Sequence, residues 1–74
     1  MKNEFVIHID GTEFKVESPT LSGAELKALV SKDATYQLFL ELPGNDPDKL
    51  IVDSEAVALK NGQHFYTLPP ATLG

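Results

Sequence analysis

The sequence predicts an α+β fold in which one helix packs across one face of a mixed sheet of four to five strands. Residues 4–17 alternate apolar and polar side chains on both sides of a tight-turn signal. Residues 22–32 then show helical spacing behind a complete N-terminal capping signal. Further apolar runs of strand length follow the helix. This order of hairpin, helix and strands is typical of α+β domains.

The first predicted element is a β-hairpin over residues 4–17. Asp10-Gly11 is a type I′ turn signal, because both positions of that turn need a positive φ. Apolar residues alternate before and after the turn, at Phe5, Ile7, Ile9, Phe14 and Val16.

The helix is predicted to run from about Gly23 to about Lys32. Ser22 and Glu25 have the spacing of a capping box, and Leu21 and Leu26 that of a hydrophobic staple. The apolar stripe expected to face the hairpin consists of Leu26, Leu29 and Val30, with Lys27 and Ser31 turned outward.

Three more strands are expected after the helix. The first covers Tyr36 to Glu41, and a loop rich in proline, glycine and aspartate follows at residues 43–48. A short strand over residues 50–52 comes next, and then a turn and two residues that need burial, Val57 and Leu59. The last strand runs from His64 to Leu68 and is stopped by Pro69-Pro70.

Size and composition argue against a self-sufficient enzyme. The chain has 74 residues, which leaves little volume for an enclosed catalytic cavity beside the core. It has no cysteine, which excludes disulfides and thiolate nucleophiles and fits a reducing compartment. No apolar run is long enough for a signal peptide or a membrane span, so we expect a cytoplasmic protein that needs no cofactor.

The charge balance points to a protein partner. The net charge is −5, and the six lysines are scattered among eleven acidic residues, with no arginine. A nucleic-acid binder normally carries a basic face that displaces counterions from phosphates. The chain is therefore not expected to bind nucleic acid or an anionic membrane, and a partner with a basic surface fits better.

Four stretches resemble the multiubiquitin-domain family of bacterial ubiquitin-like proteins, whose fold is the β-grasp of ubiquitin. The resemblance covers about residues 4–70, and the order and spacing of the stretches carry it. They are Phe5-Val6-Ile7-His8-Ile9-Asp10-Gly11, Leu21-Ser22-Gly23-Ala24-Glu25-Leu26, residues 53–62, and His64-Phe65-Tyr66-Thr67-Leu68-Pro69.

The resemblance implies a protein modifier that acts with enzymes similar to ubiquitin-activating and ubiquitin-conjugating enzymes, often with a processing peptidase, and is attached to a target protein. It implies a domain over residues 1–68, a tail over residues 69–74, and conjugation through Gly74. Two features depart from the family pattern. The chain ends in Leu73-Gly74 where ubiquitin has two glycines, and it holds one copy of a domain that often occurs in tandem.

The tail has the chemistry that such a role requires. A terminal carboxylate could form an acyl-adenylate with ATP and then a thioester with an enzyme cysteine, before transfer to an amine or a hydroxyl. Glycine suits a narrow channel because it has no Cβ. Pro69-Pro70 should keep the exit stiff, and residues 69–74, which include Ala71, Thr72, Leu73 and Gly74, could reach roughly 20 Å beyond the last strand. The alternative is a frayed terminus with no chemistry.

Strand alternation predicts an exposed apolar patch on the sheet face opposite the helix. Such a patch is a plausible docking surface, and the resemblance points to the same face; the alternative is ordinary surface apolarity. The expected members are Val6, His8, Phe39, Tyr66 and Leu68.

No metal site is expected. His8 and His64 could meet across neighbouring strands, but further ligands at suitable spacing are missing. Two alternative functions stay open beside the modifier. One is a sulfur carrier with a C-terminal thiocarboxylate, and the other is an interaction module that uses the sheet face without chemistry at the tail.

Overall fold

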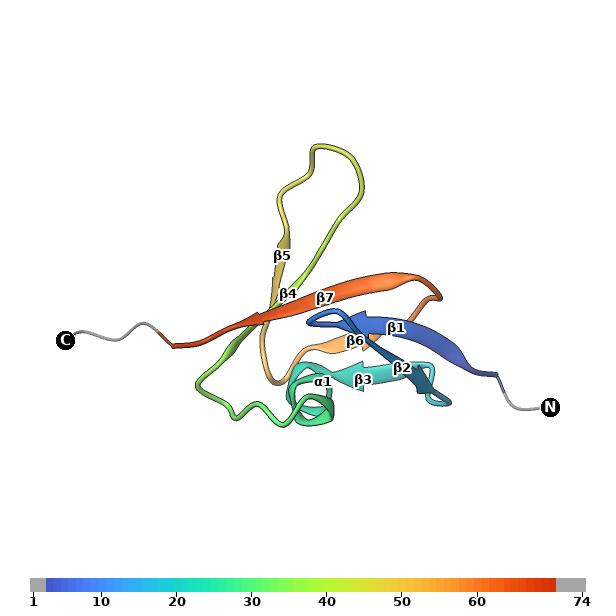
Figure 1. Cartoon of the computed structure of the whole chain (residues 1–74), viewed down its shortest axis with the longest axis horizontal. Helices are drawn as coiled ribbons and strands as arrows, with labels where there is room; N and C mark the ends of the chain where they lie inside the picture. Colours follow the sequence, from blue (N-terminus) through green and yellow to red (C-terminus); the bar gives the residue numbers. More distant parts are fainter. Residues whose placement is uncertain (1–2, 71–74) are drawn as a thin grey trace.

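The computed structural model describes residues 3–70, and it contains a five-stranded mixed sheet, a two-stranded sheet and a helix (Figure 1). The predicted α+β β-grasp-like architecture is thus confirmed. In chain order the elements are β1 Phe5–Ile9, β2 Thr12–Val16, β3 Thr20–Ser22, α1 Gly23–Leu29, β4 Gln37–Leu40, β5 Lys49–Ile51, β6 Ala56–Ala58 and β7 Gln63–Leu68.

The large sheet has the strand order β2-β1-β7-β4-β5. The first and last strands pair in parallel, with Ile7, His8 and Ile9 opposite Gln63, His64 and Phe65. All other neighbours in this sheet are antiparallel. The last strand therefore lies in the middle of the sheet, held by elements from both halves of the chain.

The β1–β2 turn has the geometry that the sequence predicts. Asp10 and Gly11 have φ values of 53° and 80°, both positive, as a type I′ turn requires. The turn fixes a register in which Ile7 lies opposite Phe14 and Ile9 opposite Thr12. Ile7 and Ile9 consequently point to the same face, and both are fully buried.

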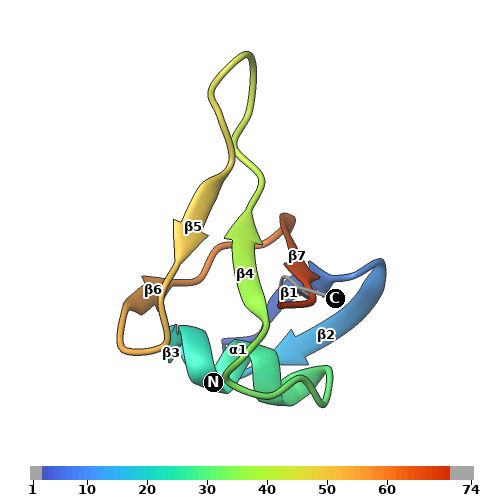
Figure 2. The same ribbon diagram turned by 90° about the vertical axis from the view of Figure 1, so that its left-hand side faces the viewer.

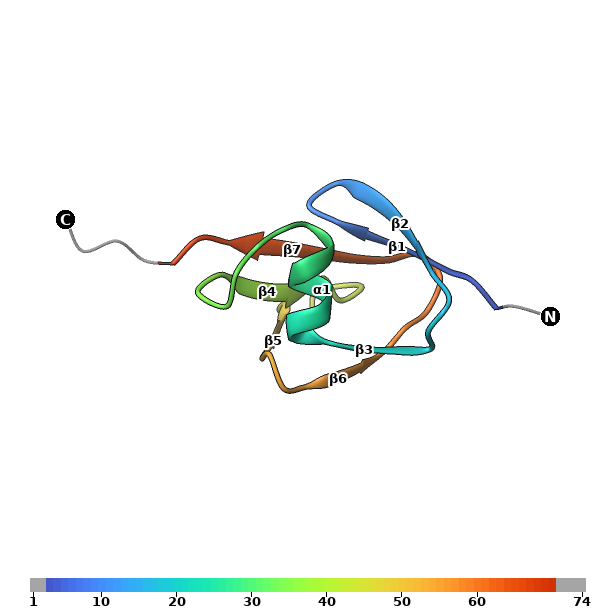
Figure 3. The ribbon, with the colours of Figure 1, turned by 90° about the horizontal axis from the view of Figure 1, so that it is seen from below.

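The helix α1 covers one face of the large sheet, as Figures 2 and 3 show from two directions. The core lies between them, and its members come from β1, α1, β4, β5, the β6 region and β7. They are Ile7, Ile9, Leu26, Leu38, Ile51, Val57, Leu59 and Phe65.

Two three-residue strands form a second sheet that the sequence did not predict. β3 pairs antiparallel with β6, with Leu21 opposite Val57. Val57 and Leu59 are buried, as expected from the sequence. This small sheet closes the core beside the start of α1 (Figure 3).

The helix is shorter than predicted and ends at Leu29. Ser31 adopts a left-handed conformation with φ 58°, which the regular helix cannot include. The Ser31 N–H donates to Ala28 O and the Lys32 N–H to Lys27 O, which is the hydrogen-bond pattern of a Schellman motif.

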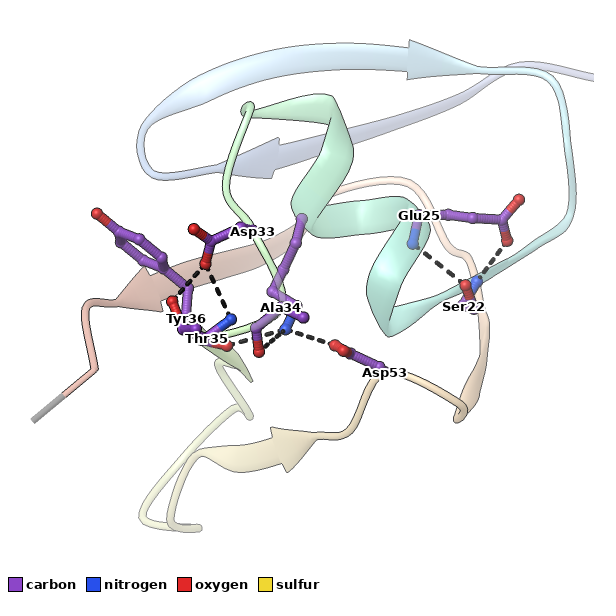
Figure 4. A network of polar contacts seen from close by, with 8 residues as sticks. Ser22, Glu25, Asp33, Ala34, Thr35, Tyr36 and Asp53 are labelled. Carbon is purple, nitrogen blue, oxygen red and sulfur yellow. Dashed lines mark hydrogen bonds and ion pairs between the residues drawn. The ribbon is translucent and has the colours of Figure 1, made fainter.

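Two side chains of α1 lie opposite to the prediction. Lys27, expected outside, is 4% exposed, whereas Leu29, expected inside, is 38% exposed. The Lys27 ammonium donates to Ala34 O and Tyr36 O at 3.3 and 2.9 Å and pairs with Asp53 (Figure 4). These partners make burial of the charge possible, because the ammonium group keeps its hydrogen bonds while the alkyl part of the Lys27 side chain is buried.

The segment after the helix is organised by Asp33. Its carboxylate accepts hydrogen bonds from both the backbone N–H and the hydroxyl of Thr35 (Figure 4). These bonds, the one from the hydroxyl first, hold the pKa of the Asp33 carboxyl below its usual value. The turn places Ala34 and Tyr36 so that their carbonyls face Lys27.

Candidate functional site

The sheet face away from α1 carries the side chains that alternate with the core residues. On β1 these are Val6 and His8, since Ile7 and Ile9 point inward. On β7 they are His64, Tyr66 and Leu68, which alternate with the buried Phe65. On β4, Phe39 lies directly opposite Tyr66. The alternation thus places the five predicted face residues on one side of the sheet.

Two stacked ring pairs occupy the middle of this face. The His8 and His64 rings are 4.6 Å apart between centroids, with 8° between their planes. The Phe39 and Tyr66 rings are 5.3 Å apart, with 16° between planes. A stacked Phe–Tyr pair contributes about 0.5–1.5 kcal/mol beyond area burial, so this contact helps to hold the Phe39 and Tyr66 rings in place.

Leu50 extends the apolar part of the face onto β5. It lies opposite Phe39 in the β4–β5 register and is 45% exposed, close to the 44% of Leu68. Leu50 could not be assigned to this face from the sequence, because residues 50–52 form one continuous apolar run. The signal was the run's short length, since in an alternating strand only the central Ile51 can be buried. We use the name "sheet face" for Val6, His8, Phe39, Leu50, His64, Tyr66 and Leu68.

Polar groups border the sheet face. The Tyr66 hydroxyl donates to an Asp48 carboxylate oxygen at 2.6 Å. This hydrogen bond, with burial and the negative charges of Asp48 and Glu41, raises the pKa of Tyr66 above its usual value. On the β2 side, Glu13 lies opposite His8, and Lys15 lies opposite Val6. An apolar centre with a polar border is the usual composition of a protein-binding patch.

The chain leaves the sheet at the end of β7. The strand ends at Leu68, and Pro69 and Pro70 are exposed. The predicted tail residues Ala71, Thr72 and Leu73 and the predicted conjugation residue Gly74 lie outside the described residues. The structure therefore defines the base of the tail.

The β1–β2 turn is fastened to the end of β7. The Asp10 carboxylate accepts hydrogen bonds from the Thr67 N–H at 2.8 Å and from the Thr67 hydroxyl at 2.6 Å. The Asp10 N–H in turn donates to Phe65 O at 3.0 Å. From the sequence, Asp10 is a turn residue only, because its contact with Thr67 depends on the parallel pairing of β1 and β7.

Another concave surface is an open groove of about 480 Å³ beside β5 and β6. It is mainly apolar, and two of its charged lining residues, Lys49 and Glu55, pair with each other at 2.8 Å. Within residues 3–70, no group of three or more histidine, aspartate and glutamate side chains is arranged to hold a metal ion. In the same range no helix is long and apolar enough to cross a membrane.

The fold and the exposed sheet face define a ubiquitin-like domain of the β-grasp class. The family model for Multiubiquitin matches residues 5–69, which is most of the chain. The chain belongs to this family, and the resemblance inferred from its sequence is confirmed. No curated protein and no solved structure matches the chain.

Proposed function

We propose that the chain is a ubiquitin-like protein modifier that is activated at Gly74 and conjugated to a target. The observation that carries the proposal is the exit of the chain at Leu68 from the central strand of the sheet, followed by the exposed Pro69 and Pro70. Membership of the Multiubiquitin family supports it. In this role the domain supplies a substrate carboxylate, and the catalytic groups belong to other proteins.

The proposed chemistry proceeds in three transfers. A carboxylate oxygen of Gly74 attacks the α-phosphorus of ATP, and pyrophosphate leaves. An enzyme thiolate then attacks the acyl carbon and expels AMP. An amine or hydroxyl of the target finally displaces the thiolate and forms an amide or an ester. Glycine at the reacting position allows close approach of the enzyme groups, because no Cβ stands in their way.

The sheet face would supply the affinity that the tail alone lacks. A short extended tail buries little area, whereas specific protein complexes need a larger interface with a well-packed centre. The stacked rings of Phe39 and Tyr66 give such a centre, and Leu50 and Leu68 widen it. We propose that activating and conjugating enzymes dock here while the tail enters their catalytic sites.

A non-covalent interaction module is the second candidate. The exposed sheet face with its stacked rings favours an interaction module, because that face would bind a partner whether or not Gly74 reacts. The two functions differ in their dependence on the tail.

The deciding experiment compares the whole chain with a Gly74 deletion and with Gly74→Ala. Each is incubated with ATP and an activating enzyme of the kind associated with this family, and intact masses are measured without reductant. The modifier proposal predicts a thiol-labile enzyme adduct for the whole chain, none for the deletion, and a much reduced amount for Gly74→Ala.

Other results would contradict the proposal. No adduct with the whole chain, on an enzyme shown to be active with another modifier, would leave the interaction module. With sulfide added as a sulfur donor that displaces AMP from the acyl-adenylate, a mass increase that matches replacement of one oxygen by sulfur on the free chain would instead indicate a sulfur carrier.

A further inference from the structure

Asp10 does more in this structure than form a turn. Its two carboxylate oxygens each hold a different group of Thr67, at 2.8 and 2.6 Å, and Thr67 precedes Pro69 by two residues. With the bond from the Asp10 N–H to Phe65 O, three hydrogen bonds join the β1–β2 turn to the end of β7. We refer to these contacts as the Asp10–Thr67 clamp.

The topology explains why β7 needs the clamp. The parallel ladder between β1 and β7 ends where Ile9 meets Phe65, because the chain reverses at Asp10-Gly11. β7 continues to Leu68, paired on its other side with β4. On the β1 side, the acceptor for the Thr67 N–H is the Asp10 carboxylate and not a backbone carbonyl. The carboxylate thus extends the ladder on that side by one hydrogen-bonded position.

We infer that Asp10 is a positioning residue for the tail: through Thr67, it fixes the direction in which the chain leaves β7. The inference rests on the proposed function, since the tail needs a fixed direction only if an enzyme must receive it. A strand end held on both sides samples fewer conformations than one held only by β4. Less conformational entropy is then lost when the tail enters a channel.

The turn itself does not require an aspartate. A type I′ turn accepts Asn-Gly and Gly-Gly equally well, because what it needs is two residues at positive φ. Glycine at position 10 can adopt the observed φ of 53° at no steric cost. Asp10→Gly therefore removes the two side-chain hydrogen bonds of the clamp, keeps the backbone bond to Phe65 O, and does not strain the turn. Asp10→Asn keeps an oxygen for the Thr67 N–H and an amide group that can donate to the Thr67 hydroxyl, so it should rescue.

The test measures ATP–pyrophosphate exchange by the activating enzyme as a function of chain concentration. For Asp10→Gly we expect the KM for the chain to rise by about five- to tenfold, which corresponds to the loss of one or two ordinary hydrogen bonds, with kcat within about twofold of the original. Thr67→Val removes one bond of the clamp and should give a smaller rise. Asp10→Asn should stay within about twofold of the unchanged chain in both constants.

Ser22→Ala is the stability control. It removes the cap of α1, whose bonds are to Glu25 and not to Asp10 or Thr67, and should leave KM unchanged although it lowers stability by about 1 kcal/mol. An equal rise in KM for Ser22→Ala and Asp10→Gly would reduce Asp10 to a structural role and overturn the inference. Normal exchange by the unchanged chain with unchanged KM for Asp10→Gly would overturn it as well. No exchange by the unchanged chain would overturn the proposed function, and the inference with it.

Discussion

Lys27 shows how a single residue can reverse its expected position. A lysine between two apolar positions of a short helix is usually exposed, because burying an ammonium ion without partners costs several kcal/mol. Here two backbone carbonyls and the Asp53 carboxylate surround the ammonium group. These partners come from the segments after α1 and after β5, so Lys27 ties three parts of the chain together.

Replacing Lys27 should therefore be costly. Lys27→Met keeps most of the apolar stem but leaves two carbonyls and Asp53 without their donor, and we expect a loss of about 2–4 kcal/mol in the free energy of unfolding. Lys15→Met, at an exposed site on β2, should change stability by less than about 0.5 kcal/mol. Urea unfolding followed by circular dichroism measures both. Equal effects of the two changes would contradict the role assigned to Lys27.

The Tyr66–Asp48 hydrogen bond should be visible in a pH titration. The hydrogen bond and the neighbouring negative charges raise the pKa of Tyr66. Its phenol should therefore ionise at a higher pH than that of an ordinary tyrosine, whose pKa is near 10. Asp48→Asn should lower the ionisation pH of Tyr66 by removing the charge. Ultraviolet absorbance of tyrosinate, recorded in a Tyr36→Phe background, isolates the signal.

The same shift sets the sign of the stability effect. A group with a raised pKa in the folded state stabilises the fold fully at pH values below its unfolded pKa. The stabilisation is lost as the pH rises through the higher, folded pKa of Tyr66. Stability of the unchanged chain should therefore fall in alkaline solution, and more steeply than that of Asp48→Asn. Equal slopes for the two proteins would show that the hydrogen bond does not couple to folding.

At the scale of elements, α1 is defined by its two ends. At the N-terminus, Ser22 Oγ accepts from the Glu25 N–H at 3.1 Å, and Glu25 Oε1 accepts from the Ser22 N–H at 2.8 Å. This is the capping box that the sequence predicts. At the C-terminus, Ser31 occupies the left-handed position of a Schellman motif, where glycine is the usual residue.

Ser31→Gly should stabilise the domain. Glycine relieves the Cβ strain at φ 58°, and we expect a gain of about 0.5–1 kcal/mol after the entropic cost of glycine. Ala28→Gly, inside the same helix, should instead cost about 1 kcal/mol. Thermal unfolding compares the two variants directly. Destabilisation by Ser31→Gly would contradict the assignment of residue 31 to the left-handed position.

Gly23 should resist replacement for a reason outside the helix. A Cβ at this position would lie 2.3 Å from the Val52 carbonyl oxygen, so the backbone around residue 52 would have to move. Gly23→Ala should therefore destabilise by about 1–3 kcal/mol, although alanine has the higher helix propensity. Chemical denaturation gives the value. A stabilised Gly23→Ala variant would mean that the start of α1 does not lie against the backbone of Val52.

The elements with a strong local signal could be predicted from the sequence, and those that depend on distant contacts could not. The β1–β2 hairpin and the helix cap are specified by neighbouring residues, through Asp10-Gly11 and through Ser22 with Glu25. β3 and β6 have three residues each, too few to predict a strand from their own pattern, and they pair where Leu21 lies opposite Val57. The burial of Lys27 likewise depends on carbonyls that the fold brings near.

At the scale of the whole molecule, the sheet order makes β7 the structural centre. It lies between β1, its parallel partner, and β4, its antiparallel partner, and carries the buried Phe65. β5 lies at the sheet edge, next to a β4–β5 connection that projects from the body in Figures 1 and 2. The candidate sheet face could be predicted because strand alternation fixes sidedness. The addition of Leu50 and the clamp needed the strand order.

Hydrogen exchange should follow this order. We expect the amides of β7 and β1 to exchange at the rate of global unfolding, and those of β5 and β6 to exchange faster through local opening. Amide exchange followed by NMR measures the difference residue by residue. Slower exchange in β5 than in β7 would contradict the assignment of β7 to the centre.

The parallel pairing of β1 and β7 also determines how copies of the domain can be joined in tandem. Because the two strands run side by side in the same direction, the start of β1 and the end of β7 lie at opposite ends of the sheet (Figure 1). In a fusion of two copies, the chain would therefore leave the first domain at the end opposite to its entry and would not have to cross that domain again. A fused protein or a fluorescent label joined ahead of β1 would lie at the end of the sheet opposite to the base of the tail.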